Sequence, residues 1–144
     1  MTDIGPNVLQ TVPLLGVRDI SESLRFYVGG LGFRKTNEWK PEGRLRWCRL
    51  ELDDVALMLQ EFWTDGSHAN VPEGKLGVGM SLNFTCNDAL RIYREMTSRG
   101  VAAKRPFVGN AMWVTSVTDP DGYELHFQSV TDVPEETVYR ESSP

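Results

Sequence analysis

The stretch Leu57-Met58-Leu59-Gln60 is matched 68 residues later by Leu125-His126-Phe127-Gln128. In both stretches large apolar side chains fall at alternate positions, which is typical of a β-strand with one buried face. Gly32 and Gly100 are separated by the same 68 residues. A repeat at constant spacing predicts two similar structural halves.

The residues around each stretch predict the same order of elements twice: a strand, a helix and three more strands. The expected strands are 8–17, 33–39, 45–52, 55–62, 78–86, 101–107, 111–118 and 123–129, with helices from Ile20 to the glycines at 29–32 and over 88–99. The segment 64–77 has no periodicity and is expected to be a connecting loop. We therefore predict one α+β domain over 1–144. It contains two βαβββ modules, about 8–63 and 77–129, in a curved mixed sheet with helices on its outer face, an open cleft, and a tail at 130–144.

Composition narrows the possible partners of the chain. It has 144 residues, of which 40% are hydrophobic and 24% charged, and a formal net charge of -5. That balance is typical of a globular protein and disfavours nucleic acid as a partner. We expect neither a secretory signal nor a membrane span. Cys48 and Cys86 lie in apolar strands and favour two reduced thiols in a cytoplasmic protein over a disulfide or a metal role.

Alternation along the strands divides the side chains between two faces of the sheet. One set is expected to pack on the helices: Pro13, Leu15, Val17, Leu57, Leu59, Met80, Leu82, Phe84, Leu125 and Phe127. The other set is expected to stay open: Gln10, Val12, Leu14, Trp47, Arg49, Glu51, Ala56, Met58, Gln60, Phe62, Ser81, Asn83, Thr85, Glu124, His126 and Gln128. This second face combines aromatic, amide and charged groups, which favours a ligand cleft over a solvated face or a subunit interface.

Several side chains of that face are suited to small-molecule recognition. Trp47 and Phe62 can stack on a planar ligand, with Trp113 extending the wall, while amides and charged groups fix its polar edges. The candidate ligand-binding residues are Trp47, Arg49, Met58, Gln60, Phe62, Ser81, Asn83, Trp113, Glu124, His126 and Gln128. The acidic Glu51, Glu61 and Glu124 favour a cationic ligand, although Arg49 opposes this. No nucleotide-binding loop is recognised, and no cofactor is expected.

Four motifs in order resemble the vicinal oxygen chelate superfamily, which includes glyoxalase I, bleomycin resistance proteins and extradiol dioxygenases. They are 12–19 leading into Phe26-Tyr27, the turn 30–33, the strand 57–61 and the closing Asp119-Pro120-Asp121-Gly122-Tyr123-Glu124-Leu125. The resemblance covers about 8–129. It implies paired modules, an open cleft and a homodimer.

The resemblance also implies where a metal would be held. The ligand positions of the metal-dependent members correspond here to Val12, Met58, Ser81 and His126. Only His126 suits a divalent ion, so we predict that no metal is bound and that the chain is closest to the metal-free bleomycin resistance type. An unorthodox site including His68, Glu51, Glu124 and His126 is the less favoured alternative.

These observations favour one function over two others. The leading hypothesis is a metal-independent protein that binds an antibiotic or a metabolite and thereby gives antibiotic resistance. The first alternative is an enzyme of the same superfamily, a lyase, transferase or dioxygenase, acting through an unusual metal site or through acid–base chemistry of His126 with Glu124. The second is a non-catalytic interaction domain. The ligand and any catalytic residues stay unknown.

Overall fold

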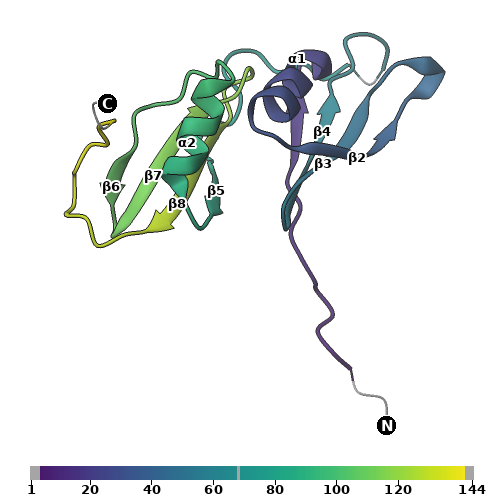
Figure 1. The fold of residues 1–144 in the computed structure, drawn as a ribbon. Helices are drawn as coiled ribbons and strands as arrows, with labels where there is room; N and C mark the ends of the chain where they lie inside the picture. Colours follow the sequence, from purple (N-terminus) through teal and green to yellow (C-terminus); the bar gives the residue numbers. More distant parts are fainter. Residues whose placement is uncertain (1–3, 68, 142–144) are drawn as a thin grey trace.

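The computed structural model describes residues 4–67 and 69–141 of the chain (Figure 1). His68, considered above for an unorthodox metal site, lies outside the described residues. Within those ranges no helix is long and apolar enough to cross a membrane.

The described residues form the two predicted βαβββ modules. The first contains β1 (Leu14–Val17), α1 (Ile20–Leu24) continued by the π-helical η1 (Arg25–Gly30), β2 (Arg34–Trp39), the short 3-10 turn η2 (Pro41–Gly43), β3 (Trp47–Leu52) and β4 (Val55–Glu61). The second contains β5 (Leu82–Thr85), α2 (Ala89–Ser98), β6 (Phe107–Gly109), β7 (Met112–Thr118) and β8 (Glu124–Val130). The α+β class and the repeated element order are confirmed.

Both helices begin and end with matching local chemistry. The side chains of Asp19 and Asp88 accept hydrogen bonds from backbone N–H groups in the first turns of α1 and α2, as N-cap residues do. Gly32 and Gly100 follow the helices with φ of 90° and 86°, a left-handed conformation that costs glycine little. The sequence signals for both helices are therefore satisfied in the structure.

Three predicted strands are shorter than expected, each for a local reason. The first begins only at Leu14, because Pro13 before it has no N–H to donate to β4, and the chain before Pro13 projects from the fold (Figure 1). The fifth begins at Leu82, after Gly77 and Gly79, which both have positive φ. The sixth covers Phe107–Gly109 instead of 101–107, and the tight turn that follows it has positive φ at Asn110 and Ala111, as in a two-residue hairpin.

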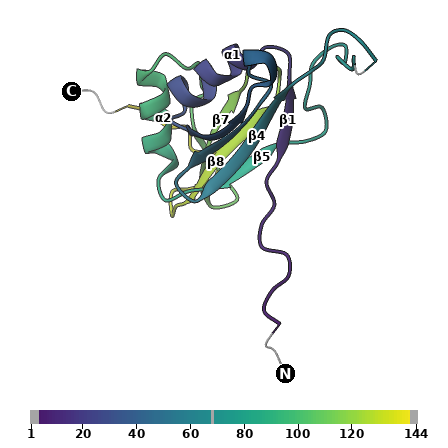
Figure 2. The ribbon, with the colours of Figure 1, turned by 90° about the vertical axis from the view of Figure 1, so that its right-hand side faces the viewer.

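The strands form two four-stranded sheets, one in each module, rather than one continuous sheet. Their orders are β1-β4-β3-β2 and β5-β8-β7-β6, and in each the first strand pairs parallel with the fourth. Figure 2 shows α1 and α2 on the same side of the two sheets. The faces turned away from the helices therefore point in a common direction.

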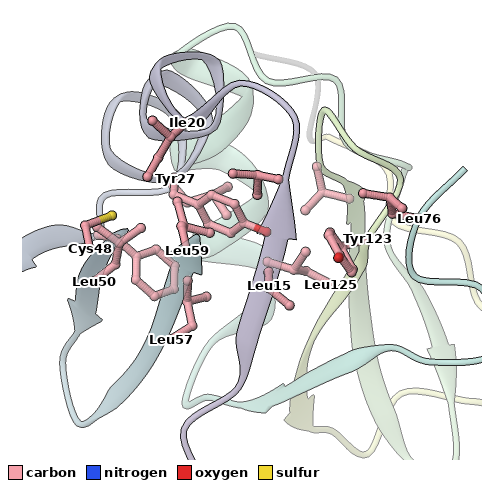
Figure 3. Close-up of a cluster of buried hydrophobic side chains, with 14 of the residues drawn as sticks. Leu15, Ile20, Tyr27, Cys48, Leu50, Leu57, Leu59, Leu76, Tyr123 and Leu125 are labelled. Carbon is pink, nitrogen blue, oxygen red and sulfur yellow. The ribbon is translucent and has the colours of Figure 1, made fainter. Parts of the chain in front are cut away.

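One apolar core joins the modules on the helix side. Leu15 and Leu59 of the first sheet, Leu125 of the second and Tyr27 of η1 are at most 1% exposed and belong to the same cluster (Figure 3). Burying each leucine contributes about 2 kcal/mol. The hydroxyl of Tyr27 also donates to Asp119 at 2.8 Å across the module boundary. The two modules are thus joined by a shared apolar core and by a hydrogen bond.

The residues after β8 pack against the second module. Backbone bonds of 2.8–2.9 Å join Val108 to Thr137 and Glu136 and join Tyr139 to Pro106. The ring of Tyr139 also meets Trp113 edge to face at 6.1 Å. This part of the tail therefore covers β6, which is the outer edge of its sheet.

Candidate functional site

The side chains turned away from the helices form a surface that we call the open face. Strand pairing places on it Leu14, Gly16, Trp47, Arg49, Glu51, Ala56, Met58 and Gln60 from the first sheet, and Asn83, Thr85, Ser116, Glu124, His126 and Gln128 from the second. On the opposite face, alternate residues of β4 and β8 such as Leu57 and Leu125 are buried. The predicted division of these two strands between faces is confirmed.

The half of the open face on the first sheet is aromatic and apolar. Trp47 pairs with Gln60 and Arg49 with Met58, and all four are half-buried. Phe62 follows β4, and its ring lies 2.4 Å from where a Cβ on Gly16 would be. Because glycine has no side chain, the ring can lie directly over β1. These groups give a planar ligand rings and a thioether to contact.

The half on the second sheet carries connected polar groups. The Oγ of Ser116 lies 2.7 Å from Nδ1 of His126, and Nε2 of His126 is 3.8 Å from Oε2 of Glu124. The Asn83 amide donates to the hydroxyl of Ser81 at 2.9 Å and accepts from Gln128 at 3.5 Å. Donors and acceptors are therefore already ordered when a ligand arrives.

The acidic groups thought to attract a cationic ligand all have basic partners. Glu51 pairs with Arg49 at 3.5 Å, and Glu124 pairs with Lys75 at 3.5 Å. A hydrogen bond from Thr36 and the charge of Arg49 lower the pKa of Glu51. Glu61 lies on the helix side, where its carboxylate is buried. The acidic groups of the open face are thus largely balanced by bases.

Glu61 has a structural position at the start of the first helix. Its carboxylate accepts the backbone N–H of Ile20 at 3.0 Å and bonds from Arg44 at 2.6 Å and Arg46 at 3.1 Å. The Arg46 guanidinium in turn lies 4.1 Å from the ring centre of Trp63. This cluster joins α1 to the strands rather than serving the open face.

Two placements depart from the sequence prediction, and one residue was missed. Trp113 pairs with Ser129, one position from Gln128, so it lies on the helix side against Tyr139 instead of extending the ligand wall. Ser81 precedes β5 and reaches the network through Asn83. Ser116, the partner of His126, was not predicted, although counting back from the turn 119–122 would have paired the two residues.

The positions implied for a metal do not provide a metal-binding donor set. Opposite Met58 lies Leu14, and opposite His126 lies Asn83, so Val12 and Ser81 come two residues before the positions that face these ligand places. In either register His126 supplies the single strong ligand. Among residues 4–67 and 69–141, no three His, Cys, Asp or Glu side chains come together in a metal-binding group. The described residues at these positions do not fit a catalytic divalent ion.

The two cysteines are free thiols in the structure. Burial raises the pKa of Cys48 to about 11 and also raises the pKa of Cys86. Both thiols are therefore protonated near neutral pH, and neither is an activated nucleophile.

Comparison with known proteins adds a family and a set of similar folds. The family described as Glyoxalase/Bleomycin resistance protein/Dioxygenase superfamily matches residues 8–127. A bleomycin-binding protein solved in complex with bleomycin is similar, with a TM-score of 0.66 and 21% identity over 85% of this chain and 98% of that chain. No curated protein matches the sequence significantly.

Two further solved structures share the fold. The antibiotic-binding protein TnmS3 from Streptomyces sp. CB03234 has a TM-score of 0.61 and 18% identity over 85% of this chain and 98% of that chain. A glyoxylase/bleomycin resistance protein/dioxygenase domain from Frankia sp. EAN1pec has a TM-score of 0.66 and 16% identity over 87% and 99% of the two chains. At these identities the similarity establishes the fold alone.

Proposed function

The chain belongs to the Glyoxalase/Bleomycin resistance protein/Dioxygenase superfamily, and on that premise we propose that it binds a small molecule on its open face without a metal ion. The ligand is an antibiotic or a metabolite. Sequestering an antibiotic in this way would protect the cell that makes the protein.

The composition of the open face carries this proposal. Trp47 and Phe62 provide ring surfaces on one half, and Asn83, His126 and Gln128 provide hydrogen-bonding groups on the other. A small-molecule site needs this combination of apolar contact and a few placed polar groups. Two proteins of the same fold are described as binding bleomycin or an antibiotic, which also supports a binding role.

Charge pairing narrows the kind of ligand that we propose. The carboxylates of Glu51 and Glu124 already have basic partners at 3.5 Å. A cationic ligand would have to displace Arg49 or Lys75 before it could pair with either. Ring stacking and amide hydrogen bonds therefore dominate recognition, and an aromatic ligand is favoured over one selected by positive charge alone.

We also propose that the protein works as a cytoplasmic homodimer. Ile4, Val8 and Leu9 lie in the projecting N-terminal segment and are at least 82% exposed, and 4–13 contains no charged residue. Exposed apolar side chains of this kind are covered when a second copy packs on them. Light scattering coupled to gel filtration should give twice the monomer mass of 16.2 kDa, and a monomer at micromolar concentration would contradict the dimer.

The test of binding is isothermal titration of basic, aromatic and peptide-like antibiotics, bleomycin included. Wild-type protein treated with EDTA should bind at least one aromatic compound, and added zinc should leave the affinity unchanged. Trp47→Ala should weaken binding at least about tenfold, equivalent to about 1.4 kcal/mol. Absence of binding across the panel, or binding only with metal present, would contradict the proposal.

Trp113→Ala is the matched control. It also removes a tryptophan side chain, but from the helix side of the second sheet, where Trp113 contacts Tyr139. Its affinity for the compound should equal that of the wild type. Equal losses in the two variants would mean that the open face is not the binding surface.

A second candidate function rests on the contacts of His126. With Ser116 2.7 Å from Nδ1 and Glu124 3.8 Å from Nε2, the imidazole is oriented as a general base would be. The face could then transfer a proton to or from a bound ligand.

Mass spectrometry of each bound compound after prolonged incubation distinguishes the two functions. Simple binding predicts that the compound is recovered unchanged from both wild type and His126→Ala. A product that forms with the wild type and is lost in His126→Ala would instead establish the enzyme.

A further inference from the structure

The two modules meet at a pair of junctions that are related by the repeat. At one, the turn between β7 and β8 meets the start of α1; at the other, the turn between β3 and β4 meets the start of α2. Arg18 and Asn87 occupy matching places, 69 residues apart and each just before an N-cap aspartate, and the same offset relates Tyr27 to Met96. The two junctions can therefore be compared position by position.

Hydrogen bonds join the turn to β1 and η1 at the first junction, and a surface hollow of about 600 Å³, lined in part by Phe26, Asp119 and Pro120, lies beside them. The Oδ1 of Asp119 accepts three backbone N–H groups, from Asp121, Gly122 and Tyr123, each at 2.9 Å, and its Oδ2 accepts the Tyr27 hydroxyl. Asp121 accepts the backbone N–H of Arg18 at 3.1 Å. The hydroxyl of Tyr123 donates to the carbonyl of Gly16 at 2.9 Å. Every large polar group there is used to close the contact.

The second junction is built from smaller groups and stays hollow. Met96 has no hydroxyl to reach the facing turn, Asn87 is shorter than arginine, and the turn is only Asp53-Asp54. A hollow of about 300 Å³ results. Its apolar lining residues are Leu31, Leu52, Cys86, Ile92, Met96 and Phe127, and its polar and charged ones are Asp53, Asn87, Asp88, Arg91, Glu95 and Arg99. A neighbouring hollow of about 260 Å³ shares Leu52, Cys86, Ile92 and Phe127 with it.

The walls of this hollow are suited to an uncharged guest. Met96 and Phe127 are at most 2% exposed, and the Phe127 ring stacks on Phe84 at 4.8 Å. Most charged groups at the rim have partners: Arg91 pairs with Glu95 at 2.8 Å, Arg99 donates to the Gly30 carbonyl at 3.3 Å, and Asp88 accepts the backbone N–H of Arg91 at 3.0 Å. Because burial raises the pKa of Cys86, its thiol adds no charge.

We propose that this hollow is a second ligand site, separate from the open face, for an uncharged aromatic molecule of one or two fused rings. Phe127 and Met96 reach it from the helix side of the second sheet, whereas His126 and Gln128 point the other way. An apolar cavity of about 150 Å³ takes up benzene, so about 300 Å³ has room for two fused rings. The site does not depend on the function proposed for the open face.

Methionine methyl groups report on the two sites separately. Met96 lines the hollow, whereas Met58 lies on the open face. In protein labelled with ¹³C at its methionine methyls, indole should shift the Met96 signal upfield in a saturable manner, because an aromatic ring shields a methyl that it faces. Indole should leave Met58 unmoved. A Met96 signal that does not respond to millimolar indole would overturn the proposal, as would a response confined to Met58.

Filling the hollow provides the matching variant test. Cys86→Leu should weaken the binding of indole at least about tenfold and leave the Met58 signal in place, and Ile92→Phe is a second filling variant should the first not fold. A folded filling variant that binds indole with the affinity of the wild type would overturn the proposed site. An antibiotic that shifts only the Met58 signal would support the function proposed for the open face. The titration of the wild-type Met96 signal with indole would still decide separately whether the hollow binds a ligand.

Discussion

The two modules attach their helices to their fourth strands through the same backbone donor but different side chains. In the first module the N–H of Ile20 donates to the buried carboxylate of Glu61 at 3.0 Å; in the second the N–H of Ala89 donates to the hydroxyl of Ser129 at 2.8 Å. Glu61 also holds Arg44 and Arg46, whereas Ser129 has no charge to offer. Both modules therefore provide an acceptor for the first N–H group of the helix, but the two contacts differ in how much they stabilise the fold.

The largest expected difference is between the two turns at the module junctions. Asp119→Ala leaves the Tyr27 hydroxyl and three backbone N–H groups without their acceptor, which should cost about 3–4 kcal/mol. Asp53→Ala at the other junction should cost no more than about 1 kcal/mol. Urea unfolding of both variants measures this, and equal losses would mean that the two junctions are equally tight.

The contacts of Glu61 and Ser129 with the two helix starts should differ by a smaller amount in their contribution to the free energy of unfolding. Glu61→Ala leaves a buried N–H and the nearly buried Arg46 without an acceptor and should lower the free energy of unfolding by about 2–3 kcal/mol. Ser129→Ala frees only the N–H of Ala89 and should cost about 1 kcal/mol. Thermal and urea unfolding give both values. The comparison fails if the serine variant is the less stable.

A third contrast concerns the edge strands of the two sheets. Thr85 has the place in β5 that Gly16 has in β1, so only the first module lets a ring lie over its edge strand. Gly16→Ala should displace Phe62 and cost about 1–2 kcal/mol. Gly29→Ala, where nothing lies within 4 Å of the new Cβ, should stabilise by about 0.5 kcal/mol. Unfolding measurements test the stabilities, and a folded Gly16→Ala with unchanged ligand affinity would show that Phe62 is not part of the site.

The smallest expected effect is a change in how the free energy of unfolding depends on pH. Burial raises the pKa of Asp121, so the charged form is less favoured in the folded chain than in the unfolded one. The stability that this group contributes is therefore present below its unfolded pKa and is lost as pH rises through its folded pKa. The stability of wild type relative to Asp121→Asn should fall from acidic to neutral pH. Urea titrations at several pH values measure it, and a difference that rises with pH would reverse the sign.

Sequence reasoning recovered the fold because the fold rests on local signals. Alternating apolar residues predicted strands such as 57–60, and glycines marked where the helices end. The fifth strand was predicted too long, because Gly77 and Gly79 before Leu82 have positive φ. The sixth was predicted at 101–107 but lies at Phe107–Gly109. The first strand was predicted too long, because Pro13 lacks the N–H that strand pairing needs and the chain before it projects from the fold.

The candidate site was predicted less completely because faces and partners depend on register. Alternation placed Trp47, Met58, Asn83 and His126 on one face, yet an error of one position in β7 assigned Trp113 to that face and missed Ser116. Likewise Glu61 looked like an acidic group of the cleft. The residue that would pair with it, the N–H at the start of the helix, is 41 positions away in the chain.

The sequence by itself determined the two modules and their order of elements. These follow from periodicity, capping residues and side-chain chemistry, which act over a few neighbouring residues. Only the tertiary structure decided which carboxylates are paired and that Trp47 rather than Trp113 lies on the open face. It also decided that Tyr27 bonds Asp119 at one junction while Met96 lines a hollow at the other. Those outcomes depend on contacts between residues far apart in the chain, and local patterns do not encode such distances.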